Sequence, residues 1–214
     1  MKNNKVQFLV GAIFSLSLSV ATVSAQEQAP APSFKEGDSW QFNRNNKGQT
    51  TSSSEQISGI YELTFTQGQM KLYEVVGNQK NELDVKPGGP GEGLFAAVAS
   101  SEQRPTLKFP ISVGQKWTYE YETTPVGARV AQKRSAEVMV TGMETVTTPG
   151  GSFKAYKLLR TEQWRGAGQR AVWNKSTATY FYSPETKSVV KSSTVNENSG
   201  AISENELIKF TPGK

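Results

Sequence analysis

The sequence predicts an all-β protein, or nearly so, whose strands form a curved antiparallel sheet shaped as a half-barrel or a barrel. Short segments alternate between apolar and polar residues, which is the period of a strand. Turn signals rich in Gly, Pro, Asn and Ser separate these segments. No segment keeps the period of about 3.6 residues over the length of an ordinary helix.

A repeated motif indicates two related halves within one domain. The residues Gly-Asp-Ser-Trp-Gln-Phe at 37–42 recur as Gly-Gln-Lys-Trp-Thr-Tyr at 114–119, and both runs read Gly-x-x-Trp-x-aromatic. A Pro- and Gly-rich cluster at 86–93 must form a loop or linker between the halves. We therefore predict a β-rich domain over 34–214, with halves at about 34–93 and 105–210.

The expected strands follow from alternation and turn signals in each half. In the first half, 57–66 and 70–76 form a hairpin, a short strand follows at 83–85, and 94–99 is compatible with one helical turn. In the second half, Trp117, Tyr119 and Tyr121 alternate with polar residues, which places three rings on the core face and the acids in water. A phase slip between Ala155 and Tyr156 predicts a twisted or bulged strand there. The further strands expected in this half are 135–141, 144–148, 152–164, 171–173, 177–182, 188–194 and 202–210.

The N-terminal residues have the pattern of a secretory signal peptide. Lys2 and Lys5 precede an apolar stretch at 8–20, and Val-Ser-Ala at 23–25 provides the small residues that a signal peptidase needs. A retained anchor is the alternative, but this stretch is shorter than the ~20 residues that span a bilayer. We predict a signal peptide over 1–25 with cleavage after Ala25, a disordered lead over 26–33, and a periplasmic or secreted location with no later transmembrane segment.

The composition excludes several catalytic chemistries. The chain contains no His and no Cys, so it cannot form a Ser–His–acid triad, a Cys nucleophile or a His-ligated zinc site. Ser188 and Lys191 match Ser-x-x-Lys, but residues three apart in a strand point to opposite faces. Glu120 and Glu122 share a strand face at a spacing of about 7 Å, yet they lie opposite the rings, in water. We expect no enzyme activity, no catalytic residue, no metal and no cofactor.

Aromatic residues are the candidates for a ligand groove. Rings at Trp40, Trp117, Tyr119, Tyr121 and Trp164 would line the concave face of the sheet. Ordinary core packing is the alternative interpretation of the same residues. In an open half-barrel the concave face is both the core and the ligand site.

Basic residues offer a second candidate surface. The chain carries a net charge of +5, and basic residues outnumber acidic ones between Arg129 and Lys175. Arg160, Arg165, Arg170 and Lys175 are the candidates for contact with an anionic partner such as a lipid headgroup. A solvated outer face is the alternative. Nucleic acid is not an expected partner, because a signal peptide directs the chain away from it.

Three motifs resemble a known group of proteins. They are Phe-Pro-Ile-Ser-Val-Gly-Gln-Lys-Trp-Thr-Tyr at 109–119, Pro-Gly-Gly-Ser-Phe-Lys-Ala at 149–155 and Tyr-Phe-Tyr-Ser-Pro-Glu at 180–185. Over roughly 105–195 the chain resembles uncharacterised exported bacterial β-rich proteins, some of them similar in shape to the half-barrel of periplasmic lipoprotein carriers and receptors. The resemblance implies a non-enzymatic binding or carrier module for a lipid, an acyl chain or another envelope component. A structural or assembly protein, which contacts partners through β-edges and the basic segment, is the alternative.

Overall fold

The computed structural model describes residues 28–48, 58–83, 104–124, 131–166 and 173–214. The predicted signal peptide, the Pro- and Gly-rich cluster at 86–93 and the turn at 94–99 lie outside these residues. The described residues contain strands and turns but no helix, and therefore none with the length and apolar character needed to cross a bilayer.

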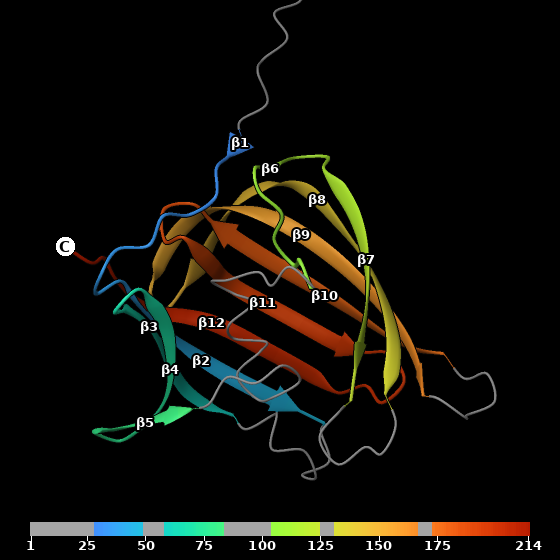
Figure 1. Ribbon diagram of the computed structural model, residues 1–214, viewed down its shortest axis with the longest axis horizontal. Coiled ribbons are helices and arrows are strands. Elements are labelled where there is room, and N and C mark those ends of the chain that lie inside the picture. The colour runs from blue at the N-terminus through green and yellow to red at the C-terminus, as the bar shows by residue number, and fades with distance from the viewer. Residues whose placement is uncertain (1–27, 49–57, 84–103, 125–130, 167–172) are drawn as a thin grey trace, which may run out of the picture.

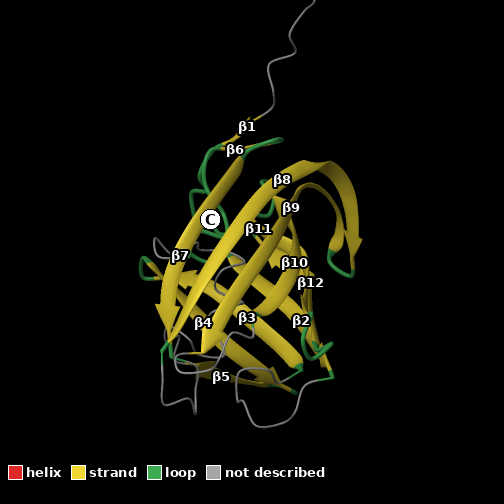
Figure 2. Ribbon diagram, turned by 90° about the vertical axis from the view of Figure 1, so that its right-hand side faces the viewer, coloured by secondary structure: helices red, strands yellow, loops and turns green. Residues whose placement is uncertain are grey.

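One antiparallel sheet of 10 strands forms the body of the protein, in the order β5-β4-β3-β2-β12-β11-β10-β9-β8-β7. Figures 1 and 2 show the sheet curving around a concave face, with β5 and β7 as its two edges. The predicted all-β class and curved antiparallel sheet are confirmed for the described residues, and the sheet is open. The strands are β2 (Ser39–Lys47), β3 (Gly59–Thr66), β4 (Gln69–Val76), β5 (Gln79–Leu83), β7 (Lys116–Thr123), β8 (Gln132–Thr148), β9 (Gly151–Gly166), β10 (Asn174–Ser183), β11 (Ser188–Asn196) and β12 (Ile202–Thr211).

The two copies of the repeated motif have the same local geometry. Gly37 and Gly114 have φ of 87° and 84°, a region that favours glycine. The Gly37 amide donates to the Phe65 carbonyl at 2.9 Å, and the Gly114 amide donates to the Val140 carbonyl at 2.8 Å. In each copy the acceptor lies two residues beyond the residue that faces the tryptophan on the neighbouring strand. The motif therefore starts β2 and β7 in the same register against β3 and β8.

Both motif tryptophans belong to the packed core. Trp40 is 0% exposed and Trp117 is 7% exposed. The Trp40 indole donates to the Thr186 carbonyl, and the Trp117 indole donates to the Pro105 carbonyl, both at 2.6 Å. Each lies in one of two buried apolar clusters, and the members on the central strands β2, β10, β11 and β12 lie on the concave face. The buried members are Trp40, Phe42, Tyr61, Leu63, Leu72, Val146, Phe153, Ala155, Val190 and Leu207 in the first cluster, and Ala29, Leu107, Ile111, Trp117, Val138, Val140, Tyr156, Leu158, Tyr182 and Val189 in the second.

A long bent hairpin connects the two clusters. The expected strands 135–141 and 144–148 form one strand, β8, because a bulge between Val140 and Gly142 absorbs the irregularity instead of ending the strand. The predicted phase slip in β9 is confirmed, since Ala155 and Tyr156 are both buried and belong to different clusters. Figure 2 shows the hairpin arching over the sheet. At its tip, the Gly150 amide donates to the Leu207 carbonyl on β12 at 3.0 Å.

The start of the described chain differs from the expectation of a disordered lead over 26–33. Gln28–Ala29 form β1, which pairs with β6 (Ile111–Ser112) in a separate two-stranded sheet. Ala29 is 3% exposed and packs in the second cluster. Burial of this small apolar side chain holds the lead against the sheet.

Asp38, in the first motif copy, joins its own segment to two distant parts of the chain. This fully buried carboxylate accepts hydrogen bonds from the Lys35 amide at 2.8 Å, the Gly213 amide at 2.8 Å and the Lys187 ammonium at 2.7 Å. Burial alone would raise the pKa of Asp38, but the hydrogen bonds from Gly213, Lys187 and Lys35 hold it below its ordinary value. The carboxylate therefore stabilises the fold in its ionised form.

Replacing this carboxylate in Asp38→Asn should lower the free energy of unfolding by about 3 kcal/mol at pH 7, because it leaves a largely buried ammonium without its partner. The ionised carboxylate contributes stability above its unfolded pKa of about 3.9 and loses that contribution as the pH falls towards the lower folded value. The free energy of unfolding of the wild type, measured with denaturant, should therefore fall below about pH 4. The decrease should be smaller in Asp38→Asn. Glu204→Gln, in an exposed ion pair with Lys47, should cost less than about 1 kcal/mol. Equal stability of Asp38→Asn and wild type at pH 7 would contradict this role.

Candidate functional site

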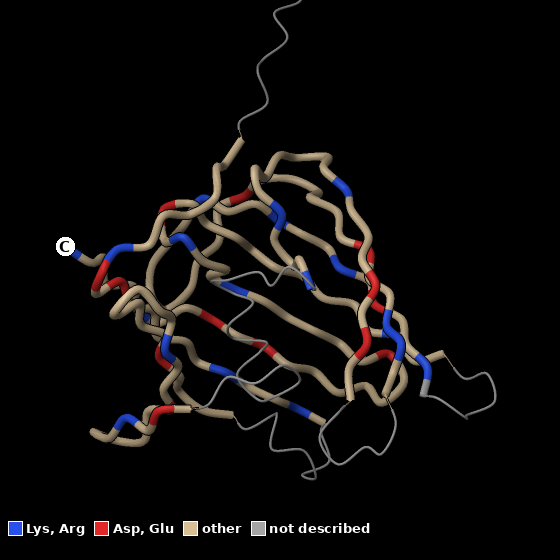
Figure 3. The backbone as a smooth tube through the Cα atoms, in the orientation of Figure 1, with Lys and Arg blue, Asp and Glu red and all other residues tan. Residues whose placement is uncertain are grey.

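The concave face changes from apolar to polar along every central strand. Beyond the two apolar clusters, the strand register places polar and aromatic side chains on the same face. Figure 3 marks acidic and basic residues along β7, β8 and β9, and these belong to both faces of the strands. We call the polar part of the concave face the polar half. Its side chains are Arg44 and Asn46 on β2, Tyr119 and Tyr121 on β7, Arg134 on β8, Arg160, Glu162 and Trp164 on β9, Ser176 and Tyr180 on β10, Ser192 and Thr194 on β11, and Ser203 and Asn205 on β12.

One carboxylate organises the β7–β9 side of the polar half. Glu162 accepts a hydrogen bond from the Tyr121 hydroxyl. It also forms ion pairs with Arg134 and Arg160, each at 3.2 Å. The Glu162 side chain is 4% exposed, whereas those of Arg134 and Arg160 are 21% and 17% exposed. We call these four residues the Glu162 cluster.

Aromatic rings fix the planes of the guanidinium groups. The Arg134 guanidinium lies 4.6 Å from the centre of the Trp164 ring, and the Arg160 guanidinium lies 5.4 Å from that of Tyr180. Such cation–π contacts hold the flat face of each guanidinium and leave its N–H groups to point outward in the plane. The two guanidiniums are therefore oriented before any ligand arrives.

The charge states of the cluster follow from its contacts. Burial alone would raise the pKa of Glu162, but the charge of Arg160, the Tyr121 hydrogen bond and the charge of Arg134 hold it below its ordinary value. Burial and the negative charge of Glu162 raise the pKa of Tyr121. At neutral pH one carboxylate thus faces two guanidiniums and a neutral phenol, and the cluster has an excess positive charge.

Several buried polar atoms in the polar half have no hydrogen-bond partner in the part of the chain that the structure describes. They are Nε of Arg134, Nε of Arg160, Oδ1 of Asn205, and both Nδ2 and Oδ1 of Asn46. A buried polar group without a partner costs about 1–3 kcal/mol. Each such group in a folded protein requires an explanation, such as a bound water, ion or ligand.

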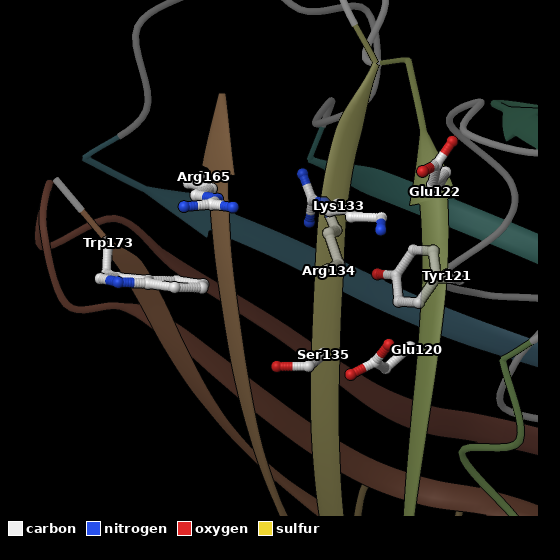
Figure 4. Close-up of a pocket in the computed structure, with 8 residues that line it drawn as sticks. All are labelled: Glu120, Tyr121, Glu122, Lys133, Arg134, Ser135, Arg165 and Trp173. Atoms are coloured by element: carbon white, nitrogen blue, oxygen red, sulfur yellow. The ribbon is translucent and has the colours of Figure 1, made fainter. Parts of the chain in front are cut away.

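The convex face holds the other basic candidates. Lys133 and Arg165 pair across β8 and β9, and Glu122 faces Lys133 from β7. The Arg165 guanidinium lies 5.5 Å from the ring centre of Trp173, which is 53% exposed. Figure 4 shows Trp173, Arg165, Lys133 and Glu122 in this order along a shallow hollow. Its charges are mixed and open to solvent.

The structure separates the residues that the sequence groups together. Of the five aromatic candidates, Trp40 and Trp117 lie in the core, whereas Tyr119, Tyr121 and Trp164 lie in the polar half, where Tyr119 stacks on Tyr121 at 6.0 Å. Of the four basic candidates, Arg160 faces inward, and Arg165 and Lys175 lie on the opposite face. Lys175 pairs with Glu197 at 3.1 Å, and Arg170 is outside the described residues.

Sequence reasoning missed Arg134, Glu162, Asn46 and Asn205. Strand parity carries the signal that would have found two of them. Arg134 has the same parity as the buried Ala136 and Val138, and Glu162 has the same parity as the buried Leu158. A charge in phase with buried apolar residues indicates an inward-facing charge.

The residues that matched catalytic patterns lie apart from the polar half. Glu120 and Glu122 are exposed on the convex face. Ser188 is buried beside Thr186, and Lys191 forms an ion pair with Glu206 at 2.7 Å. Among the described residues, no three acidic side chains come close enough together to hold a metal ion.

Comparison with known proteins gives matches among solved structures alone. No protein-family model matches the chain, and no curated protein matches it. A lipoprotein candidate from Parabacteroides distasonis is 11% identical, with a TM-score of 0.46 over 87% of this chain and 100% of that one. An exported-protein candidate with a YmcC-like fold from Bacteroides fragilis is 13% identical, with a TM-score of 0.41 over 86% and 99%. The hypothetical lipoprotein YmcC from Escherichia coli is 14% identical, with a TM-score of 0.47 over 82% and 85%. All three are described as exported proteins or lipoproteins, the class of bacterial protein that the sequence motifs resemble.

Removing the central charge in Glu162→Gln should lower the free energy of unfolding by about 2–3 kcal/mol, because two largely buried guanidiniums lose their shared carboxylate. The pKa of Tyr121 should fall in this variant, because the negative charge of Glu162 contributes to raising it. Denaturant unfolding and an absorbance titration of the tyrosines measure the two effects. The control is Glu206→Gln in the more exposed pair with Lys191, which should cost less than about 1 kcal/mol. Equal decreases in the free energy of unfolding for the two substitutions would show that the Glu162 cluster stabilises the fold no more than an exposed ion pair does.

Proposed function

We propose that this protein is a non-enzymatic binding or carrier module of the bacterial cell envelope, and that the polar half of its concave face holds a ligand with an anionic group. The basic, apolar and small-residue pattern of 1–25 supports export. The observation that carries the ligand proposal is the Glu162 cluster, in which two oriented guanidiniums share one carboxylate.

An anionic group would complete the cluster in both charge and hydrogen bonding. Arg134 and Arg160 together present ten N–H donors. Both guanidiniums contact Glu162, and Arg134 also donates to Gln132. A phosphate or carboxylate would accept from the Nε atoms that lack a described partner and would balance the excess positive charge. The aromatic contacts reduce the ordering that such a ligand would have to impose.

The apolar half is a poor place for an acyl chain. Its large side chains are packed against one another, and Trp40, Leu63, Leu72, Leu158 and Leu207 are all 0% exposed. An acyl chain laid on the polar half would bury the unpaired polar atoms without satisfying them. We therefore assign recognition to the anionic headgroup of an envelope component.

A binding role also fits the titration behaviour of the cluster. A general acid or base works best with a pKa near the operating pH. The pKa of Glu162 is lowered and that of Tyr121 is raised, so both move away from neutrality. The chain has no His or Cys to supply such a group elsewhere. These features suit a site that holds a ligand without exchanging protons with it.

Inorganic phosphate should raise the melting temperature of the wild-type protein, because a ligand that binds only the folded state stabilises it. The shift should shrink as sodium chloride is added, since the interaction is between charges. Arg160→Gln should weaken phosphate binding at least tenfold by calorimetric titration, and Arg160→Lys should recover part of it. Arg165→Gln is the matched control on the same strand and the opposite face, and it should bind like the wild type.

Vesicles of phosphatidylglycerol provide the second arm of this experiment. Flotation with the vesicles that depends on Arg160 would identify a lipid headgroup as the source of the anion. Binding of phosphate alone would indicate a soluble anionic component. Absence of both kinds of binding, or equal losses in Arg160→Gln and Arg165→Gln, would overturn the proposal and favour an assembly role.

A further inference from the structure

The polar half extends well beyond the Glu162 cluster. Cross-strand pairing places Arg160, Ala178, Thr194, Ser203 and Asn46 in one row across β9, β10, β11, β12 and β2. Four steps between neighbouring strands correspond to about 19 Å along the sheet. The row therefore starts at the arginine cluster and ends far beyond the reach of a single phosphate group.

A second row runs beside the first. It places Tyr180, Ser192, Asn205 and Arg44 next to one another on β10, β11, β12 and β2. The Asn205 amide donates to the Ser192 hydroxyl at 3.1 Å, while Asn205 Oδ1 has no described partner. Between Arg160 on β9 and Arg44 on β2, the two rows consist mainly of small hydroxyl and amide side chains. We call these residues the amide–hydroxyl floor: Ser192, Thr194, Ser203, Asn205 and Asn46.

The chemistry of this floor matches a hydroxyl-rich ligand. A carboxamide both donates and accepts hydrogen bonds, and so does a hydroxyl group. Asn46 has a donor and an acceptor that are both buried and without a described partner. A neighbouring sugar hydroxyl can satisfy both kinds of group, whereas an acyl chain can satisfy neither.

Two other polar occupants fit less well. An extended peptide binds by adding to the free edge of a sheet, but the floor lies on the central strands β11, β12 and β2. A bare phosphate can reach the guanidiniums but leaves Asn46, at the far end of the row, unused. Neither occupant accounts for both ends of the floor.

We infer that the ligand is an anionic carbohydrate, with its charged group at Arg134 and Arg160 and its sugar hydroxyls on the amide–hydroxyl floor. This inference rests on the proposed function, because the same arginines supply the charge recognition. It adds the substrate class: a phosphorylated or acidic glycan in place of a simple anion or a lipid chain. The floor selects for hydroxyl groups, and the Glu162 cluster selects for charge.

Three probes test this inference: inorganic phosphate, maltotriose, and maltotriose carrying one phosphate group. The third combines the anionic group of the first with the sugar hydroxyls of the second. In calorimetric titration, the phosphorylated trisaccharide should bind the wild-type protein at least tenfold more tightly than phosphate, and maltotriose should bind weakly. Asn46→Ala and Asn205→Ala should each reduce the affinity for the phosphorylated trisaccharide at least threefold and leave the phosphate affinity unchanged. Asn45→Ala, the neighbouring residue exposed on the convex face of β2, should change neither affinity.

The outcomes separate the two proposals. If phosphate binds in an Arg160-dependent manner but the trisaccharide gives no gain, the carbohydrate inference is wrong and the proposed function stands. If the phosphorylated trisaccharide binds more tightly than phosphate but substitution of Asn46 and Asn205 does not change its affinity, the amide–hydroxyl floor does not bind the sugar. The inference is then also wrong. If none of the three probes binds, the carbohydrate inference is wrong. If the phosphatidylglycerol vesicles also fail to bind, the proposed function fails as well. Melting curves of each variant identify any loss caused by unfolding, and Asn205→Ser then provides a milder substitution at that site.

Discussion

The packing of the two motif tryptophans is the constraint on which the rest of the structure depends. Trp40 and Trp117 start equivalent strands in equivalent registers, and each anchors its ring through an indole hydrogen bond to a backbone carbonyl. Around them the two clusters contain the buried large apolar side chains of the described residues. The bent β8–β9 hairpin contributes to both clusters and so holds the curvature of the sheet. Because stability is concentrated in this half, the other half of the same face is free to carry charge.

The polar half is costly for a surface that served folding alone. Each buried donor or acceptor without a partner costs about 1–3 kcal/mol, and replacing charged groups with well-packed apolar residues is often neutral or stabilising. The chain nevertheless retains Arg134, Arg160 and Glu162 on the inner face, together with the amides of Asn46 and Asn205. Local departures from good packing and full hydrogen bonding are typical of functional sites. The polar half is therefore a better candidate site than the convex hollow, where Arg165 and Lys133 are solvated.

The fold could be predicted from the sequence wherever one strand face is apolar. The alternation of Trp117, Tyr119 and Tyr121 predicts the inner face of β7, and the slip at Ala155 and Tyr156 predicts the bend in β9. The outer part of β2 gives no such signal, because Asn43 to Lys47 are polar on both faces. The basic candidates were grouped by their position in one segment, although Arg160 and Arg165 are an odd number of residues apart and so face opposite sides of the strand. Pairing between distant strands, such as β12 with β2, is what brings Asn205 beside Arg44, and a single sequence does not specify it.

The position of Glu162 explains how a basic site can be both ordered and available. Two guanidiniums in one concave face would repel each other and move apart without a carboxylate between them. A second carboxylate would neutralise them and leave little attraction for an anion. A single carboxylate holds Arg134 and Arg160 in place and leaves a net positive charge. The rings of Trp164 and Tyr180 fix the planes of the two guanidinium groups. The lowered pKa of Glu162 and the raised pKa of Tyr121 keep this charge constant around neutral pH. Ligand affinity at such a site would therefore respond to ionic strength much more than to pH.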